Sequence, residues 1–227
     1  MRVCKIVIPL WISVISATFL ARAQGTFQNL DFESSRIIPI VNGDYGQTTI
    51  AVTNALPGWA VFIGSNQVSQ ITYNDPALGS TWVTLWATNG QQISGNYSVL
   101  LQGGLTASSA SISQTGLIPV LAESLLFEAQ PQADAGTLEV SLRGVNLPFF
   151  ALSSGANYTL YGADISAFAG QTEQLTFSAL VEVSSYGNDW NIDNIQFSNL
   201  PIPEPGVFSL SVLGALLLGW RVLRRRG

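Results

Sequence analysis

The chain has 227 residues, a formal net charge of −5, no histidine and one cysteine, Cys4. The absence of histidine excludes Ser-His-Asp and Cys-His catalysis and zinc sites with imidazole ligands. Between Gln24 and Pro203 there are two basic residues, 13 acidic residues and no lysine, which gives a formal charge of −11. This balance argues against nucleic-acid binding, because phosphate recognition needs basic side chains, and it suits an extracellular module that binds cations.

The first residues read as an export signal. Arg2 and Lys5 form a basic start, and residues 6–20 are almost entirely apolar. Ala21 and Ala23 are the small residues that a signal-peptide cleavage site needs. We therefore expect a secretory signal peptide over residues 1–23, recognised by the Sec export machinery and cleaved to leave Gln24 first. The alternative is an uncleaved membrane anchor.

The next predicted unit is an ectodomain over residues 24–200. Turn signals such as Pro57-Gly58 and Gly95-Asn96 separate short runs of β-branched and aromatic residues. Strands are predicted over residues 81–86, 97–101, 109–113, 124–129, 137–143, 174–183 and 190–197, the last with one register slip. We find no useful helical periodicity, so an all-β fold is expected, an antiparallel β-sandwich. Five aromatic residues are expected in loops: Tyr45, Tyr73, Phe149, Phe150 and Tyr186.

Three short segments occur in a familiar order: residues 29–33 (NLDFE), 56–59 (LPGW) and 190–195 (WNIDNI). Over residues 27–198 this order resembles the galactose-binding-like jelly rolls of bacterial exported proteins and carbohydrate-binding modules. The resemblance implies a jelly roll with a structural calcium ion between the first and last strands, at Glu33 and Asp193. Carboxylate oxygens suit Ca²⁺. The alternative is that both residues cap turns or bind water.

Paired carboxylates can do acid–base catalysis without histidine. Asp31 and Glu33 are two residues apart and would share one face of a strand. Asp189 and Asp193 flank Trp190. Their spacing does not separate a catalytic pair from solvated surface groups, so we expect no enzyme. A carboxylate-based glycosidase or lyase is the alternative.

Aromatic side chains are the usual platform for sugar stacking. Trp82 and Trp86 share one face of a predicted strand. Aromatic residues on strands belong more often to the core, so a core position is expected and a binding face is the alternative. Sugar-binding candidates are taken instead from the expected loops: Tyr73, Asn74, Asp75, Tyr186 and Asn188.

The last residues, 201–227, form the third predicted unit. Ile202-Pro203-Glu204-Pro205 is followed by an apolar run over residues 206–220 and by Arg221, Arg224, Arg225 and Arg226. This arrangement resembles the PEP-CTERM sorting signal, with Ile202 in place of the usual valine. The resemblance implies recognition by an exosortase, with Pro203-Glu204-Pro205 as the processing motif. It also implies a Gram-negative host that produces exopolysaccharide and forms biofilms.

The length and the charges of this segment fit a helix that holds the chain in the membrane only transiently. A helix over residues 206–220 spans about 22 Å, which is shorter than the roughly 30 Å hydrocarbon core. Val222 and Leu223 extend the expected transmembrane helix to residues 206–223, with Arg221 at the interface. The arginine tail stays cytoplasmic by the positive-inside rule. An ordinary tail anchor is the alternative.

Together these patterns predict an exported, non-catalytic protein of the cell surface or extracellular matrix. It would pass through the inner membrane during sorting and then associate with extracellular polysaccharide or biofilm. A structural adhesion protein without a small ligand is the alternative to carbohydrate binding.

Overall fold

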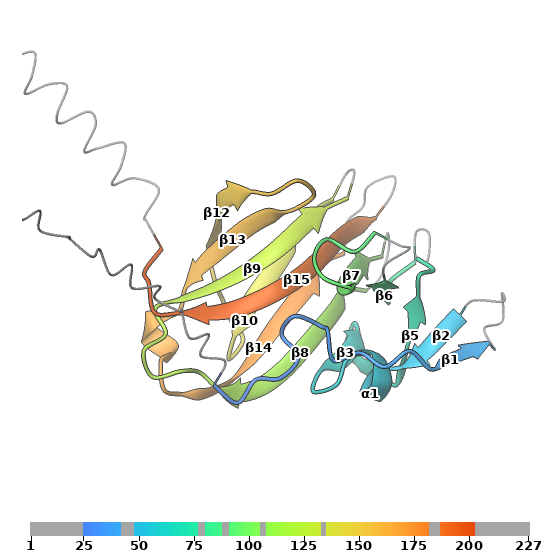
Figure 1. The fold of residues 1–227 in the computed structure, drawn as a ribbon, viewed down its shortest axis with the longest axis horizontal. Helices are drawn as coiled ribbons and strands as arrows, with labels where there is room; N and C mark the ends of the chain where they lie inside the picture. Colours follow the sequence, from blue (N-terminus) through green and yellow to red (C-terminus); the bar gives the residue numbers. More distant parts are fainter. Residues whose placement is uncertain are drawn as a thin grey trace, which may run out of the picture.

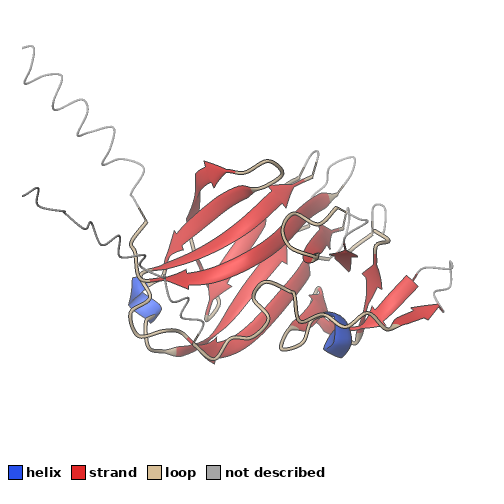
Figure 2. Ribbon diagram, viewed as in Figure 1, coloured by secondary structure: helices blue, strands red, loops and turns tan. Residues whose placement is uncertain are grey.

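The computed structural model describes residues 25–41, 48–76, 80–87, 91–104, 108–132, 135–181 and 187–202, which form two facing β-sheets (Figures 1 and 2). One sheet has nine strands in the order β1-β2-β5-β6-β7-β15-β9-β13-β12. Their bounds are β1 Pro39–Val41, β2 Thr48–Ala51, β5 Gln70–Tyr73, β6 Trp82–Ala87, β7 Tyr97–Gly103, β15 Asn188–Ser198, β9 Ser124–Pro131, β13 Thr159–Asp164 and β12 Phe149–Ser154.

The other sheet has six strands in the order β11-β10-β14-β8-β3-β4. Their bounds are β11 Val145–Asn146, β10 Leu138–Leu142, β14 Thr172–Ala179, β8 Ala110–Leu117, β3 Ala60–Ile63 and β4 Asn66–Val68. Two short helical turns accompany the sheets, α1 (Val52–Ala55) and the 3₁₀ turn η1 (Ser166–Phe168).

From β7 onward the chain crosses repeatedly between the sheets, and β15 finally inserts between β7 and β9. It is antiparallel to both neighbours. The last strand therefore lies in the middle of the nine-stranded sheet, and its side chains are flanked on both sides by those of other strands.

The core lies between the two sheets and follows the alternation of the strands. An aromatic group joins them: the Phe127 ring on β9 meets that of Phe177 on β14 edge to face, with centroids 5.2 Å apart. Phe149 and Tyr161, from β12 and β13, pack against the same Phe127 ring at 5.3 and 5.5 Å. Both Phe127 and Phe177 are fully buried, so this group fixes how the sheets face each other.

The all-β sandwich prediction is confirmed, and each predicted strand has a counterpart in β6, β7, β8, β9, β10, β14 or β15. The register slip expected in the last strand is a pairing irregularity between Asp193 and Gln196. The finer jelly-roll connectivity and the three-unit division stay predictions.

Two sequence-based expectations about element positions are wrong, and several short strands were not predicted. Tyr73 ends β5, and Phe149 and Phe150 begin β12, so these aromatic residues lie on strands rather than in loops. The strand expected up to residue 183 ends at Ala179. The short strands β1–β5 were missed because runs of three or four residues carry too little alternation to detect.

The predicted signal peptide over residues 1–23 and the membrane segment over residues 206–223 lie outside the described residues. Within the described ranges, no helix has the length and apolar character needed to cross a bilayer.

The outer face of the nine-stranded sheet

Alternate residues of β6, β7, β15 and β9 point away from the core, and we call the surface they form the outer face. Val83 and Leu85 of β6 belong to the core cluster, whereas Trp82 and Trp86 do not. Both tryptophans lie on the outer face, but Trp86 is only 6% exposed and so is buried as expected, whereas Trp82 is half-buried. The outer-face positions are Trp82, Thr84, Trp86, Ser98, Leu100, Gln102, Leu126, Glu128, Gln130, Asp189, Asn191 and Asp193.

One row across this face joins an aromatic ring to two polar side chains. Gln102 pairs in register with Trp82 on one side and Asp189 on the other. Its Nε2 donates to Asp189 Oδ2 at 3.2 Å. Burial raises the pKa of Asp189, and the hydrogen bond from Gln102 partly offsets this. Trp82 is half-buried, and its Nε1 has no hydrogen-bond partner among the described residues. We call these three residues the Trp82 row.

A second row holds two buried carboxyl groups. Asp193 and Glu128 are direct cross-strand partners, and they are 1% and 7% exposed. Asp193 Oδ1 accepts from the Asn194 amide at 2.6 Å, and Glu128 Oε1 accepts from Asn194 Nδ2 at 2.8 Å. Their second oxygens, Oδ2 and Oε2, have no partner in the described part of the chain. Ser98 Oγ and Asn191 Oδ1, on the same face, are also buried and unpartnered.

The electrostatics of this acidic row favour a proton or a cation. Burial is the main cause that raises the pKa of Asp193 to about 8, while the hydrogen bond from the Asn194 amide lowers it. The neighbouring carboxylates of Glu128, Glu33 and Asp31 raise it further. Without a cation, Asp193 is therefore protonated at neutral pH.

Hydrogen bonds to Glu33 and Asn191 hold the segment of residues 91–97 beside the acidic row. Glu33 Oε1 accepts from the backbone amides of Asn96 at 2.6 Å and Tyr97 at 3.1 Å, and its Oε2 accepts from Asn96 Nδ2 at 2.8 Å. Asn191 Nδ2 donates to the Gln91 carbonyl at 2.8 Å. The segment thus lies over part of the outer face and is held at both ends.

Two expectations about Glu33 are wrong. Glu33 precedes β1 and lies in a turn, so neither it nor Asp31 is on a strand. The Glu33 amide donates to Asp31 Oδ1 at 3.3 Å, so the two residues meet within this turn and do not share one face of a strand.

Gly95 should be intolerant of a side chain because Glu33 fills its space. A Cβ there would lie 2.1 Å from Glu33 Oε1, and the backbone φ is +53°. We expect Gly95→Ala to displace the carboxylate, to lower the free energy of unfolding by about 2 kcal/mol, and to speed hydrogen exchange at the Asn96 and Tyr97 amides.

Gly144→Ala is the matched control. Gly144 has a similar φ of +73°, but nothing lies within 4 Å of its Cβ position. It therefore reports the backbone strain alone. Equal losses of stability in the two variants, with unchanged exchange at Asn96, would contradict the role given to Glu33.

The expected calcium site fits only in part. The unpartnered oxygens of Asp193, Glu128 and Asn191 are hard donors of the kind that Ca²⁺ prefers. Both oxygens of Glu33 already accept hydrogen bonds. Among the described residues, no group of three or more acidic, histidine or cysteine side chains is arranged to hold a metal ion. Calcium at Glu33 and Asp193 stays a prediction, and the free oxygens favour Asp193 with Glu128.

The expected sugar ligands are partly occupied with structural contacts. Asn188 is fully buried, and its Nδ2 donates to the carbonyls of Thr137 and Leu180 at 2.6 and 3.0 Å. Asn74 Oδ1 accepts from the Ala87 amide at 2.8 Å, and Tyr73 packs against the core. Sugar binding by Tyr73, Asn74, Asp75 and Asn188 stays a prediction.

Several other expected site residues lie outside the described ranges, so their roles also stay predictions. They are Ala21, Ala23, Gln24, Tyr186, Pro203, Glu204, Pro205, Arg221, Arg224, Arg225 and Arg226.

Sequence reasoning missed Glu128 and Gln102 entirely. Glu128 could have been found, because it is the one acidic residue in a strand that was expected to be buried, between Phe127 and Ala129. A charged residue in such a run needs a partner or a ligand, which makes it a site candidate.

A separate pocket of about 570 Å³ opens between α1, β4 and β5. Trp59 and the polar side chains of Thr53, Gln67, Ser69 and Gln70 line it, together with Ala51, Val52 and Val68, and none of these residues is charged. The pocket lies apart from the outer face and provides a second concave surface against which binding can be compared.

No known protein family matches the chain in sequence, and no curated protein does. The enzymatically active domain of tailspike protein 4 from bacteriophage CBA120 aligns over 63% of this chain and 19% of its own, with a TM-score of 0.38 and 13% identity. The chain thus corresponds to about a fifth of that tailspike structure.

Two carbohydrate-binding modules align over most of their own length. TmCBM27, described for specific mannan recognition, aligns over 71% of this chain and 98% of its own, with a TM-score of 0.32 and 11% identity. The family 11 module from Clostridium thermocellum, solved with a β-1,3-1,4-mixed-linked tetrasaccharide, aligns over 68% and 96%, with a TM-score of 0.33 and 10% identity. At these scores the sandwich assignment rests on the chain's own two sheets.

Proposed function

We propose that this protein is an exported, non-catalytic module that binds an extracellular polysaccharide through the outer face of its nine-stranded sheet. The observation that carries the proposal is the Trp82 row, in which a partly exposed indole lies in register with a carboxamide and a carboxyl group. A sugar presents C–H groups to an aromatic ring and hydroxyl groups to hydrogen-bonding side chains. In this row the half-buried Trp82 and Asp189 offer these two contacts, and Gln102, which is only 2% exposed, holds the Asp189 carboxylate in place.

The charge of the domain narrows the ligand class. The formal charge of −11 between Gln24 and Pro203 repels acidic polymers. Arg36 and Arg143 are the only basic residues in that span, and neither belongs to the outer face. The proposed ligand is therefore a neutral polysaccharide.

The burial of the acidic row favours binding over hydrolysis. Two carboxyl groups on facing strands form the kind of pair that glycosidases use. Here the two groups are only 1% and 7% exposed, so a glycosidic bond cannot reach both of them in this conformation. A glycosidase role would need the outer face to open, whereas stacking of a sugar on the half-buried Trp82 ring does not.

Binding to a panel of neutral and acidic polysaccharides tests the proposal. We expect Trp82→Ala and Gln102→Ala to weaken binding of a neutral glycan by roughly tenfold or more, about 1.4 kcal/mol. Gln67→Ala makes the same change in the pocket beside Trp59 and should leave affinity unchanged. The reverse pattern would move the site to that pocket, and no binding to any glycan would remove the carbohydrate proposal.

For sorting, we propose that residues 201–227 hold the exported chain in the inner membrane of a Gram-negative bacterium until an exosortase processes it at Pro203-Glu204-Pro205. The proposal is supported by the order of the motif, the short apolar run and the arginine cluster. The processed domain would then reside at the cell surface or in the matrix.

Deletion of residues 203–227 tests the sorting proposal. We expect a freely secreted protein, detected in the culture medium by immunoblotting. If the deleted protein is found where the wild type is found, membrane retention is contradicted. If the wild-type protein keeps residues 203–227, processing at this motif is contradicted.

A further inference from the structure

Large apolar side chains are exposed at one end of the sandwich. Nine are exposed among the described residues, and four of them (Leu117, Val120, Leu121 and Leu200) lie where the described chain begins and ends. Val120 and Leu121 are the most exposed, at 73% and 72%. We call this the tail end, and it lies at the lower left of Figure 1. Clustered exposed apolar groups mark contact surfaces.

Hydrogen bonds join these residues to the first and last segments that the structure describes. The Leu117 carbonyl accepts from the Thr26 amide at 3.2 Å. On the other side of the turn, the Glu123 amide donates to the Ser198 carbonyl at 2.8 Å. Ser124 Oγ donates to the Leu200 carbonyl at 2.7 Å. The turn with Val120 and Leu121 therefore lies directly beside the place where the chain leaves the domain.

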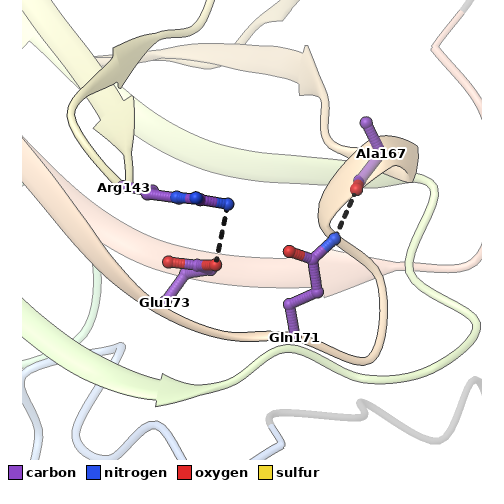
Figure 3. Close-up of polar contacts among 4 residues, drawn as sticks. All are labelled: Arg143, Ala167, Gln171 and Glu173. Atoms are coloured by element: carbon purple, nitrogen blue, oxygen red, sulfur yellow. Dashed lines mark hydrogen bonds and ion pairs between the residues drawn. The ribbon is translucent and has the colours of Figure 1, made fainter.

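The turn is held in a fixed conformation. The Ala122 amide donates to the Pro119 carbonyl at 3.0 Å. Buried Ile118 is bound on both sides: its amide donates to the Gln171 carbonyl at 2.9 Å, and its carbonyl accepts from the Gly170 amide at 3.2 Å. Gln171 in turn donates through Nε2 to the Ala167 carbonyl at 2.7 Å, as Figure 3 shows. Val120 and Leu121 are thus presented to solvent by a hydrogen-bonded framework.

The charges around the turn are mixed. Arg143 is 68% exposed, and its Nη1 lies 3.9 Å from Glu173 Oε1 (Figure 3). Glu123 and Asp164 are exposed at the same end. This end has no net basic surface, so it is not suited to binding an anionic polymer. It suits a zwitterionic lipid surface, into which its apolar side chains could insert between the headgroups.

The chain length beyond the described residues sets the distance to the bilayer. Only residues 203–205 separate Ile202 from the start of the apolar run at residue 206. Ile202 and residue 206 are four steps apart along the chain, so an extended linker spans at most about 14 Å. If the apolar run lies in the membrane, the tail end is held within that distance of the headgroups.

We propose that Val120, Leu121 and Leu200 form a membrane-contacting tip that rests on a zwitterionic bilayer while the tail is uncut. This inference rests on the sorting proposal above. The tip restricts the tilt of the domain, keeps the processing motif at the bilayer surface and directs the opposite end of the sandwich into the aqueous phase.

The test uses residues 24–227, the chain expected after signal-peptide cleavage, which has no native cysteine, in phosphatidylcholine vesicles that carry a nitroxide on the headgroup. An environment-sensitive fluorophore is attached to Val120→Cys, and the control is Val181→Cys, which is exposed and follows β14 at the opposite end. We expect blue-shifted, quenched emission at residue 120 and neither effect at residue 181. Adding Leu121→Asp should reduce the quenching at residue 120 by roughly twofold or more.

The outcomes separate the two proposals. Flotation with vesicles but equal, weak quenching at residues 120 and 181 overturns the tip and leaves anchoring intact. Loss of flotation overturns both. Quenching that persists with Leu121→Asp also overturns the tip, because the apolar contact would then not matter. A crosslinked dimer that protects residue 120 without lipid would assign the surface to a second copy instead.

Discussion

Asp193→Asn is expected to raise the melting temperature of the metal-free protein on the order of 10 °C at about pH 9. The pKa of Asp193 is raised from 3.8 to about 8, chiefly by burial. Since the folded protein holds the proton more tightly than the unfolded chain does, this group stabilises the fold below about pH 4, and the contribution is lost as the pH rises through about 8.

The expected size of this loss in the wild-type protein is on the order of 5 kcal/mol. Asparagine removes the titration and offers an N–H donor to the unpartnered Glu128 Oε2. Melting curves from pH 4 to pH 9 with a chelator should therefore slope downward for the wild type and be flatter for the variant. Asp164→Asn, at an exposed carboxylate, is the control and should keep the wild-type slope.

The same melting measurements, repeated with added calcium, test the calcium site. A bound divalent cation favours the ionised carboxylate, so added calcium should raise the wild-type melting temperature at about pH 8 and leave Asp193→Asn unchanged. If calcium does not shift the wild-type midpoint, the calcium proposal fails. The pH slope in chelator is a separate result and would stand.

Phe127→Ala is expected to lower the free energy of unfolding by about 4 kcal/mol. The ring is fully buried and contacts Phe177 across the two sheets as well as Phe149 and Tyr161 on its own sheet. Its removal leaves a cavity where the sheets are joined, which cannot collapse without moving a whole strand. Urea denaturation should show a lower midpoint with an unchanged slope.

Phe150→Ala is the matched control for Phe127→Ala. Phe150 is on β12 and 44% exposed. We expect its loss to cost less than about 1 kcal/mol. Similar losses in the two variants would contradict the assignment of Phe127 as the aromatic centre of the core.

Local alternation was sufficient to predict most of the long strands. In β10, Leu138, Val140 and Leu142 are the inward residues, and this alternation is visible in the sequence. The predicted strand ended one residue late, because Arg143 and Gly144 both adopt positive φ in the two-residue turn to β11. Arginine seldom adopts this conformation, so Gly144 alone was too weak a signal to place the turn at Arg143.

The candidate site depended on strand pairing. Asp193 and Asp189 were named from the sequence, but Glu128 and Gln102 were not, since they are 65 and 87 residues away from these partners. The insertion of β15 between β7 and β9 creates both pairs. No local pattern reports which distant strand will be the neighbour.

The amino-acid sequence by itself determined the fold class, the acidic and lysine-free character of the domain and the presence of chemically distinct ends, because composition and periodicity are local properties. Only the tertiary structure decided that Trp82 and Trp86 face outward, that Asp193 faces Glu128, and that Val120 and Leu121 lie beside the exit of the chain. A strand's alternation separates its two faces. The packing of the second sheet determines which of those faces becomes the core.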